Sequence, residues 1–577
     1  MPSAVRPGTD VVRGAGRSRW RGRVADAGRE ALGALVALAL AVIALRHVVA
    51  TDRVALLWYD GDSVLLPLVE RSMQLGQPFE WAMSPALFFF PELPVYLVCS
   101  VVTATPQQAL ALNGVLVLLA VYALVRAAAN ELMPSAGRPA RIAVSALALG
   151  FLTAVVLTES SATATSLELA SLLLTTTYYY GVVLAMLGTA VLVLRAVRLG
   201  RASVAVLVTL GLVAACTTAS NPLYVPWSAA PVVVTLVLLA LARRLPWRPA
   251  AVLAGTATAG SVVGYLLRIP LRPFVSLDPS TYVQPDRAGA TLRFFAALTD
   301  ERAALAIGDA GLLLMFAGVL LAVGGTVWAW RVRTSRAVLT ATVLPLVTVV
   351  AVSVGVVVAG SETPRYLEPV VTAPLLALVA VAELARTTVH GTRVHRPRRG
   401  VRAVLAVGAA VVLVAGAATA PSTVRAVVDA RSAGAACLDR WADGRHVTGV
   451  GQFWTVRPLA AYAAPHVELL QVRDTFATYP WLVDLGAYRD ASPTFVVIGA
   501  NDLWTVAVED SLGRPATITH CRGFDVYDYA GTAGADVLRH DVVDSADRIR
   551  RERGFASSPQ RRAVVPGALY GCIGSSA

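Results

Sequence analysis

Apolar residues recur along most of the chain in runs long enough to cross a bilayer, which takes roughly 20 residues. About eleven such runs alternate with shorter polar stretches. They lie near 30–48, 108–126, 142–158, 178–197, 202–217, 226–243, 249–267, 309–329, 337–360, 368–387 and 402–420. This pattern predicts a multi-span α-helical membrane protein with about eleven spans.

The segment 85–104 is also apolar, but it carries two prolines and a glutamate. Arginine marks cytoplasmic loops, and six stretches are rich in it: the N-terminus, 126–141, 195–201, 243–248, 331–336 and 386–402. If all of them are cytoplasmic, eleven spans alternate without contradiction, whereas a twelfth full span at 85–104 would break the alternation. We therefore predict a re-entrant or juxtamembrane segment there, covered by protein.

The last third of the chain changes character. After about 421 the polarity is mixed, with short apolar runs such as 446–454, 466–472 and 494–499, and the alternation above puts this region outside the cytoplasm. Strand-like runs alternating with helical patterns predict a small extracytoplasmic α/β or α+β domain.

The predicted organisation therefore has four parts. They are a basic cytoplasmic N-terminus at 1–29, a transmembrane domain at 30–420 whose first loop is 50–104, the extracytoplasmic domain at 421–534, and a flexible tail at 535–577.

Composition agrees with a multi-pass protein of the plasma membrane. The chain is 56% hydrophobic and 15% charged, with a mean hydropathy of +0.63, which lies outside the range of soluble globular domains. The net charge of +13 does not call for nucleic acid, because cytoplasmic loops of membrane proteins collect arginine. The bilayer is the expected partner, and the oligomeric state is unknown. No A-x-A cleavage site follows 31–45, so we expect an uncleaved first helix.

The five cysteines show no metal-ligand spacing, so a structural zinc site is not expected. Cys437 and Cys521 lie near the two ends of the predicted extracytoplasmic domain. A disulfide between them fits an oxidising compartment, and Cys572 is a rival partner.

The stretch Trp58–Val98 carries the first candidate chemistry. It places Asp60 and Asp62 one glycine apart directly after the first span. Apolar residues at 65, 68, 69 and 73 then predict a helix that lies flat on the membrane. Carboxylates beside a membrane are costly to bury, which favours a functional site, although these two acids are equally compatible with a solvated loop that ends the span.

A second candidate is the sequence Ser361–Pro369, SETPRYLEP, between two spans on the outer side. Arg365 is permanently charged and suits a phosphate, whereas an interfacial Arg365–Tyr366 anchor is the simpler interpretation.

The outer loops contain further charged residues. Arg268 and Arg272 run against the positive-inside bias and suit an anionic group, or they pair with aspartates of the same loop. Glu159 and Glu168 are candidates for a second acid. For Tyr178–Tyr180 we favour an interfacial aromatic belt.

Taken together, these residues resemble the GT-C superfamily of integral-membrane glycosyltransferases. The nearest branch contains the protein O-mannosyltransferases and the lipid A aminoarabinose transferase. The resemblance rests on WYDGDS after the first span, on the helix ending at Leu75-Gly76, and on PRYLEPVVTAPLLALVA, which is similar to that branch's Arg-Tyr-x-x-Pro helix start.

The resemblance implies a catalytic base at Asp60 or Asp62, because the first-loop acid has that role in the family. The family's Asp-Glu pair reads Asp-Gly-Asp here, so which aspartate is the base stays open. It also implies a polyprenyl-phosphate sugar as donor, transfer with inversion to a glycan, lipid or protein acceptor, and a phosphate site at Arg365 and Tyr366 with Arg268 and Arg272. No cofactor is implied with certainty, and a divalent cation is compatible with the paired aspartates.

Two other function classes stay open. A flippase for a lipid-linked glycan would need no base, but such transporters usually show repeated halves and charged residues within their spans, and neither pattern stands out. The other is an assembly protein whose extracytoplasmic domain is the functional part. The sequence does not name the sugar, its linkage or the acceptor.

Overall fold

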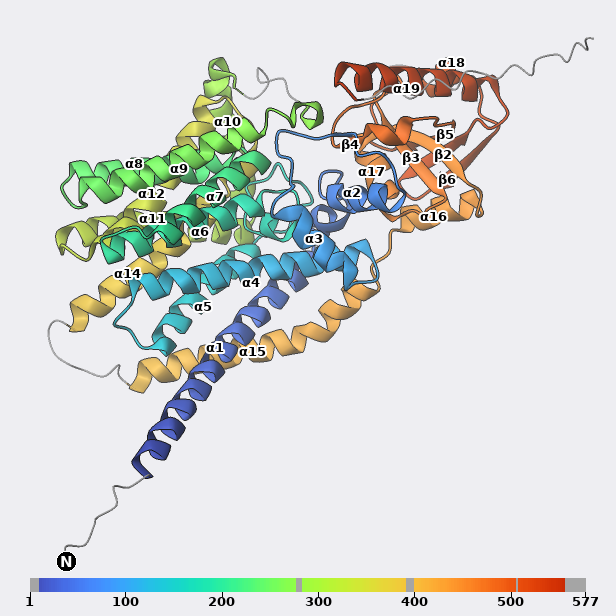
Figure 1. The fold of residues 1–577 in the computed structure, drawn as a ribbon. Coiled ribbons are helices and arrows are strands. Elements are labelled where there is room, and N and C mark those ends of the chain that lie inside the picture. The colour runs from blue at the N-terminus through green and yellow to red at the C-terminus, as the bar shows by residue number, and fades with distance from the viewer. Residues whose placement is uncertain (1–9, 277–282, 391–398, 505–506, 556–577) are drawn as a thin grey trace, which may run out of the picture.

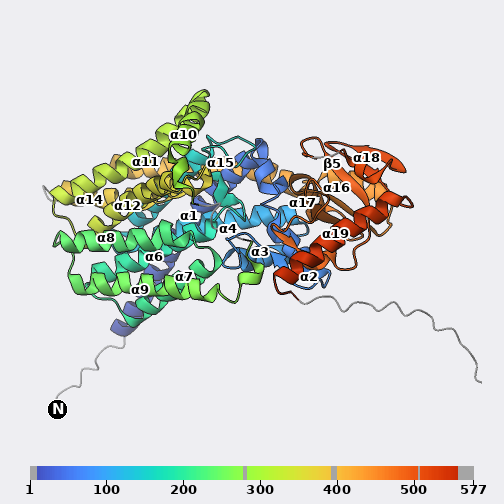
Figure 2. The ribbon, with the colours of Figure 1, turned by 90° about the horizontal axis from the view of Figure 1, so that it is seen from above.

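The computed structural model describes residues 10–276, 283–390, 399–504 and 507–555. A bundle of long helices carries a smaller sheet-containing domain at one end, and the N-terminal helix leaves the bundle at the opposite end (Figure 1). The view from above gives the same arrangement, with the sheet domain beside the end of the bundle and not on its flank (Figure 2). The fold is thus that of a multi-span α-helical membrane protein with a C-terminal domain.

Every predicted span contains a helix. Within the described ranges, nine helices are long and apolar enough to cross a membrane, while α7 and the helical stretch Val225–Leu241, which includes α8, are shorter. The bundle helices are α1 (Asp10–Ala50), α4 (Pro106–Leu132), α5 (Arg138–Val156), α6 (Tyr180–Leu199), α7 (Val204–Ser220), α8 (Ala230–Leu241), α9 (Trp247–Leu267), α11 (Ala306–Arg331), α12 (Arg336–Val358), α14 (Pro374–His390) and α15 (Arg399–Val428). Helix α10 (Ala288–Ala303) lies outside the predicted spans.

The segment 85–104 forms only one short helix, α3 (Glu92–Val101). At 1.5 Å per residue its ten residues extend about 15 Å, half of a hydrocarbon core. Glu92 at its start is 1% exposed, so protein covers the acid. This agrees with a segment that enters the bundle without crossing it.

The helix predicted to lie flat on the membrane is α2 (Leu65–Gln74). Its apolar face packs against protein, because Leu65 and Val69 are fully buried. Arg71 donates hydrogen bonds to the carbonyls of Ala464 and Val467 in the C-terminal domain. The predicted helix is confirmed. Its buried residues join a hydrophobic core that consists mainly of bundle residues, and Arg71 connects it to the C-terminal domain.

The C-terminal domain is built on a mixed five-stranded sheet in the order β3-β2-β5-β7-β6. Strands β2, β3 and β5 are parallel, and β7 and β6 form an antiparallel hairpin at the edge. The elements are α16 (Ala433–Ala442), β2 (Val447–Gln452), α17 (Phe453–Tyr462), β3 (Val467–Val472), β5 (Pro493–Gly499), α18 (Val508–Leu512), β6 (Thr517–Cys521), β7 (Phe524–Asp528) and α19 (Ala533–Glu552). The predicted boundary at 421 lies inside α15, which continues to Val428.

The prediction of a flexible tail from 535 is wrong for its first part, which forms α19. Leu538, Val542 and Ala546 are buried at intervals of four residues, and this places one stripe of the helix against the domain core. Arg550 is 1% exposed and pairs with Glu80 of the first loop at 2.6 Å. The many charges on the other faces of α19 hid this stripe in the sequence. Residues 556–577, including Cys572, lie outside the described residues.

The first loop and the C-terminal domain also share a two-stranded sheet. Strand β1 (Trp81–Ala82) pairs antiparallel with β4 (Val483–Asp484). The Asp484 carboxylate accepts hydrogen bonds from the N–H groups of Glu80 and Gly486. Residues 400 positions apart in sequence are thereby fixed against each other, so the C-terminal domain is docked on the first loop.

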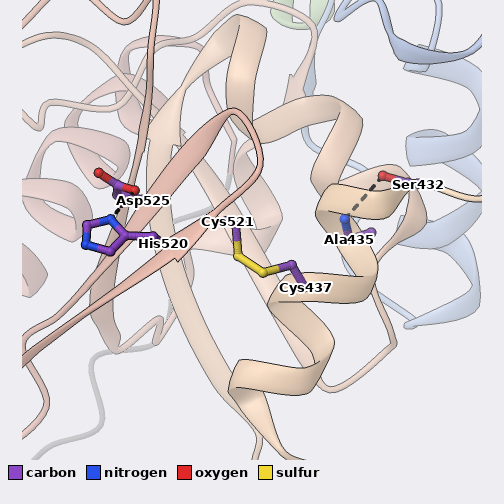
Figure 3. The surroundings of a disulfide bond; sticks show 6 residues. All are labelled: Ser432, Ala435, Cys437, His520, Cys521 and Asp525. Atoms are coloured by element: carbon purple, nitrogen blue, oxygen red, sulfur yellow. Dashed lines mark hydrogen bonds and ion pairs between the residues drawn. A yellow bond between two sulfur atoms is a disulfide. The ribbon is translucent and has the colours of Figure 1, made fainter.

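A disulfide joins Cys437 on α16 to Cys521 at the end of β6, with Cα atoms 6.0 Å apart (Figure 3). This is the first of the two pairings considered from the sequence. The same region is ordered by two local interactions: Ser432 Oγ accepts from the N–H of Ala435 to cap α16, and His520 pairs with Asp525 across the hairpin at 2.8 Å.

We expect Cys437→Ser with Cys521→Ser to destabilise the C-terminal domain by about 2–4 kcal/mol, because the bond closes a long loop in the unfolded chain. Thermal unfolding of the purified protein with and without reductant measures this. Cys216→Ser is the matched control, because Cys216 is a free cysteine. A wild-type midpoint that reductant does not move would contradict the prediction.

Candidate active site

Asp60 lies at the end of the bundle, between a short helical turn (Ala55–Tyr59) and α2. Its Oδ1 accepts hydrogen bonds from the N–H groups of Asp62 at 3.0 Å and Ser63 at 3.2 Å. It also accepts from the Tyr178 hydroxyl at 2.9 Å. Aspartate favours this turn because its side chain can bond the backbone two residues on. In the described part of the chain Oδ2 has no hydrogen-bond partner, so this oxygen is free to take a proton.

The environment of Asp60 increases its proton affinity. Burial raises the pKa of the Asp60 carboxyl to about 6, and the negative charge of Asp62 adds to the increase, while the bonds from Tyr178, Ser63 and Asp62 oppose it. A carboxyl with a pKa near 6 is mostly ionised at neutral pH and still holds a proton more firmly than a solvated aspartate does. These are the properties of an effective general base.

Asp62 faces a cation from a distant part of the chain. Its Oδ2 lies 3.6 Å from Nη1 of Arg365, and both side chains are partly buried, 16% and 29% exposed. Arg365 belongs to the 3-10 turn Pro364–Leu367, which opens the span that contains α14. Its guanidinium also lies over the Tyr178 ring, 5.4 Å from the centroid. Tyr178 therefore contacts both halves of the site, Asp60 through its hydroxyl and Arg365 through its ring.

The expectation that Tyr178–Tyr180 form an interfacial aromatic belt is wrong. The three side chains are 1%, 7% and 0% exposed. Tyr179 has a left-handed backbone with φ of 69°, and its ring packs between those of Phe88 and Tyr366, with centroids about 6 Å away. A run of tyrosines at the start of a span has the composition of a belt, but here the preceding loop folds over it and buries the rings.

The C-terminal domain closes the other side of the aspartate turn. Arg457 on α17 donates from Nε to the Gly61 carbonyl at 2.7 Å and from Nη1 to the Leu482 carbonyl. The Tyr462 hydroxyl, on the same helix, donates to the Trp58 carbonyl. Burial lowers the pKa of Arg457 to about 10, against the effect of the nearby Asp62 and Asp60 charges. The first loop therefore takes its shape from contacts with α17.

Gly61 is required by this contact. A Cβ atom added to it would lie 2.8 Å from the Phe453 ring and 3.2 Å from the Trp454 ring. Such distances are too short for any side chain without a movement of α17. The glycine between the two aspartates is thus a consequence of how closely the C-terminal domain approaches.

Two of the predicted phosphate ligands do not join Asp62 and Arg365. Arg268 is buried and donates to the carbonyls of Ala219 at 2.8 Å and Pro85 at 2.7 Å, so it fixes the segment 85–104 against α7. Arg272 is exposed, in the short turn Arg272–Phe274. Among the described residues neither makes an ion pair with the two aspartates. Buried Arg268 is occupied by carbonyl groups, so the structure places it in a structural contact.

Glu159 and Glu168 have structural partners. The Glu159 carboxylate accepts from the N–H groups of Ala170 and Ser171, and Glu168 accepts from Ser161 N–H. Arg53, 1% exposed, lies 3.6 Å from Glu168 and also bonds the carbonyls of Ser161 and Thr163. These two acids hold the loop 159–177 in place, and this loop carries Tyr178 to Asp60.

The sequence placed Tyr178 in an aromatic belt and gave no signal for Arg457. Glu368 gave none either: it is fully buried three residues after Arg365, and in the part that the structure describes neither of its carboxylate oxygens has a hydrogen-bond partner. It stands in the quoted motif SETPRYLEP, and only its burial distinguishes it from a helix-start acid.

The region contains a cavity but no cluster of metal-ligating side chains among the described residues. A cavity of about 80 Å³ lies between α2 and the C-terminal domain, with Arg457 in its wall. It is large enough for several water molecules. Over the described ranges, no three His, Cys, Asp or Glu side chains gather as a metal site would require.

Comparison with known proteins adds two solved structures. No family model matches the chain, and no curated protein matches it. The chain is similar to ArnT from Cupriavidus metallidurans bound to undecaprenyl phosphate, with 16% identity and a TM-score of 0.48 over 88% of this chain and 99% of that one. The apo structure of that ArnT gives 16% identity and a TM-score of 0.46 over 81% and 92%. At these TM-scores the likeness carries no argument about activity.

We expect Gly61→Ala to destabilise the docked arrangement by about 1–3 kcal/mol, because the new methyl group overpacks against Phe453. Thermal unfolding of the purified protein measures the loss, and Phe453→Leu in the same chain should restore part of it. Gly355→Ala is the control, since nothing lies within 4 Å of an added Cβ there. An equal effect of the two glycine substitutions would refute the close contact.

We expect Asp60→Asn to stabilise the protein at pH 7.5. The folded-state pKa of about 6 exceeds the ordinary value of 3.8, so ionised Asp60 costs stability as the pH rises from about 4 to above 6, by roughly 1–3 kcal/mol. Asparagine keeps the acceptor oxygen without the charge. Thermal midpoints measured from pH 4 to 8 should therefore diverge with increasing pH.

The control for this series is Asp443→Asn, at an exposed left-handed position that asparagine tolerates. Its midpoint should follow the wild type at every pH. An Asp60→Asn protein that is less stable than wild type throughout the range would show that the Asp60 charge is not under a burial penalty.

Proposed function

We propose that the chain is a membrane glycosyltransferase, which moves a sugar from a polyprenyl-phosphate donor to a hydroxyl group of an extracytoplasmic acceptor with inversion. The observation that carries the proposal is that Tyr178 contacts both a carboxylate of raised proton affinity, Asp60, and a cation, Arg365. All three lie at the end of the bundle that carries the C-terminal domain. Transfer chemistry needs a base and an anion site next to each other, and a carrier needs no base.

Asp60 is the proposed base. Its Oδ1 is occupied by the turn and by Tyr178, and Oδ2 is free. The acceptor oxygen attacks the anomeric carbon and loses its proton to Oδ2, while the bond from that carbon to the phosphate oxygen breaks. The bonding electrons leave with the polyprenyl phosphate. One bond forms and one breaks at the sugar carbon, on opposite faces, which inverts its configuration.

Arg365 is the proposed phosphate ligand. Its side chain stands at the start of a span, where a lipid phosphate would lie, and it balances the negative charge that grows on the leaving phosphate. In the structure Asp62 provides the opposite charge at 3.6 Å. We propose that the donor phosphate takes over this position and that Asp62 orients the guanidinium. Tyr366, packed on Tyr179, holds the turn in place.

Two independent observations support the orientation in the membrane. The arginine-rich connections lie at the bundle end away from the C-terminal domain, which the positive-inside rule assigns to the cytoplasm. The disulfide between Cys437 and Cys521 belongs to an oxidising compartment. Both support a cytoplasmic N-terminus and a site on the outer face of the plasma membrane.

The test is transfer from labelled polyprenyl-phosphate sugars in membranes of cells that lack the native gene. We expect activity with the wild type, a loss of about hundredfold or more with Asp60→Asn, because the base is removed, and a smaller loss with Asp62→Asn. Arg365→Lys keeps the charge without the two-pronged geometry and should lower activity about tenfold.

Arg287→Gln is the matched control on the same face. Arg287 forms an exposed ion pair with Glu362, whose atoms are 3.0 Å apart, and it does not pair with either aspartate in the described part of the chain. It should retain wild-type activity. Full activity of an Asp60→Asn, Asp62→Asn double variant would refute the mechanism. No transfer from any donor, together with a lipid-linked glycan retained on the inner leaflet, would identify a carrier instead.

A further inference from the structure

We propose that Trp454, which lies next to Gly61 between the two aspartates, is the platform on which a sugar ring of a glycan acceptor stacks. This inference rests on the proposed glycosyl transfer and assigns its acceptor side. It concerns an exposed aromatic side chain on α17 of the C-terminal domain.

The aspartate turn has two differently built sides. Asp60 and Asp62 direct their bonds to Tyr178 and Arg365, which belong to the membrane domain. The backbone of Gly61, between them, contacts Phe453, Trp454 and Arg457 of α17. If the donor phosphate is held at Arg365, the face of the turn that α17 contacts is left for the acceptor.

Trp454 differs from its neighbours on that side in its exposure. Phe453 is 6% exposed and Arg457 2%, whereas Trp454 is 62% exposed. The indole stands edge-on to the Phe453 ring, with centroids 4.7 Å apart and planes at 83°. The buried Phe453 ring holds the Trp454 indole in place. The indole therefore presents an exposed face next to Gly61.

The chemistry of this face selects a sugar. An indole is broad and apolar and carries one N–H donor, and in the described part of the chain the Trp454 N–H has no partner. A pyranose or furanose ring presents a flat patch of C–H groups with hydroxyls at its rim, which matches both features.

The platform adjoins the aspartate turn, because Trp454 lies next to Gly61, one residue from each aspartate. The neighbouring loop is fixed as well, because the Gln452 side chain accepts from the N–H of Leu503 at 2.9 Å. The platform is therefore ordered before any acceptor binds.

The experiment compares Trp454→Leu and Trp454→Phe in the full-length protein. The probes are a labelled polyprenyl-phosphate sugar that the wild type accepts and, as acceptor, a delipidated cell-envelope glycan fraction from cells lacking the gene. Two quantities are measured: hydrolysis of the donor without acceptor, and the acceptor concentration that gives half-maximal transfer.

We expect Trp454→Leu to raise the half-saturating acceptor concentration about tenfold, in line with the loss of one aromatic stacking contact. Donor hydrolysis should stay unchanged, because the leucine variant leaves Asp60 and Arg365 intact. Trp454→Phe keeps a ring and should stay within about threefold of wild type. Trp247→Leu is the control for loss of an exposed tryptophan, since Trp247 is 57% exposed at the start of α9, at the far end of the bundle.

The outcomes separate the two proposals. If the wild type turns over no donor, the proposed function fails. If donor is turned over but Trp454→Leu saturates like wild type, or Leu and Phe are equally impaired, the platform is refuted and Trp454 is a membrane or packing residue. Label that reaches only protein or lipid, and never the glycan fraction, refutes the glycan acceptor.

Discussion

The approach of α17 to the first loop is the contact on which the rest of the site depends. Gly61 has no space for a side chain, and Arg457 bonds its carbonyl from a fully buried position. Because of this contact the turn that holds Asp60 and Asp62 cannot relax into solvent. Burial in turn gives Asp60 its raised pKa. The raised pKa of Asp60, in the first loop of the membrane domain, thus depends in part on the C-terminal domain that packs against this loop.

Buried charges fix the loops around this contact. Arg53 satisfies carbonyls of the loop 159–177 and pairs with Glu168, and Arg550 pairs with Glu80 of the first loop. Such pairs add little net stability, because each charge is desolvated. What they provide is specificity: removing one partner leaves an uncompensated charge, so the loops have one arrangement. Tyr178 reaches Asp60 only in that arrangement.

Periodicity was sufficient to predict the fold, since each apolar run became a helix and the alternating runs 446–454, 466–472 and 494–499 became β2, β3 and β5. Their positions in the sequence drew attention to Asp62 and Arg365, which the structure brings within 3.6 Å of each other. The burial of Tyr178 and the carbonyl partners of Arg268 could not be predicted, because the local sequence is the same whether such residues face lipid, carbonyl groups or a ligand. Arg457 and Trp454 come from a helix almost 400 residues downstream, and only tertiary structure brings them to the site.

The pairing of β1 with β4, and of Glu80 with Arg550 on α19, has a consequence for biosynthesis. The partners of the first loop follow it by about 400 residues or more, so they are synthesised after the first spans. During that interval α17 does not yet exist to contact Gly61. The aspartate turn therefore acquires the surroundings described above only when the C-terminal domain folds back onto the first loop.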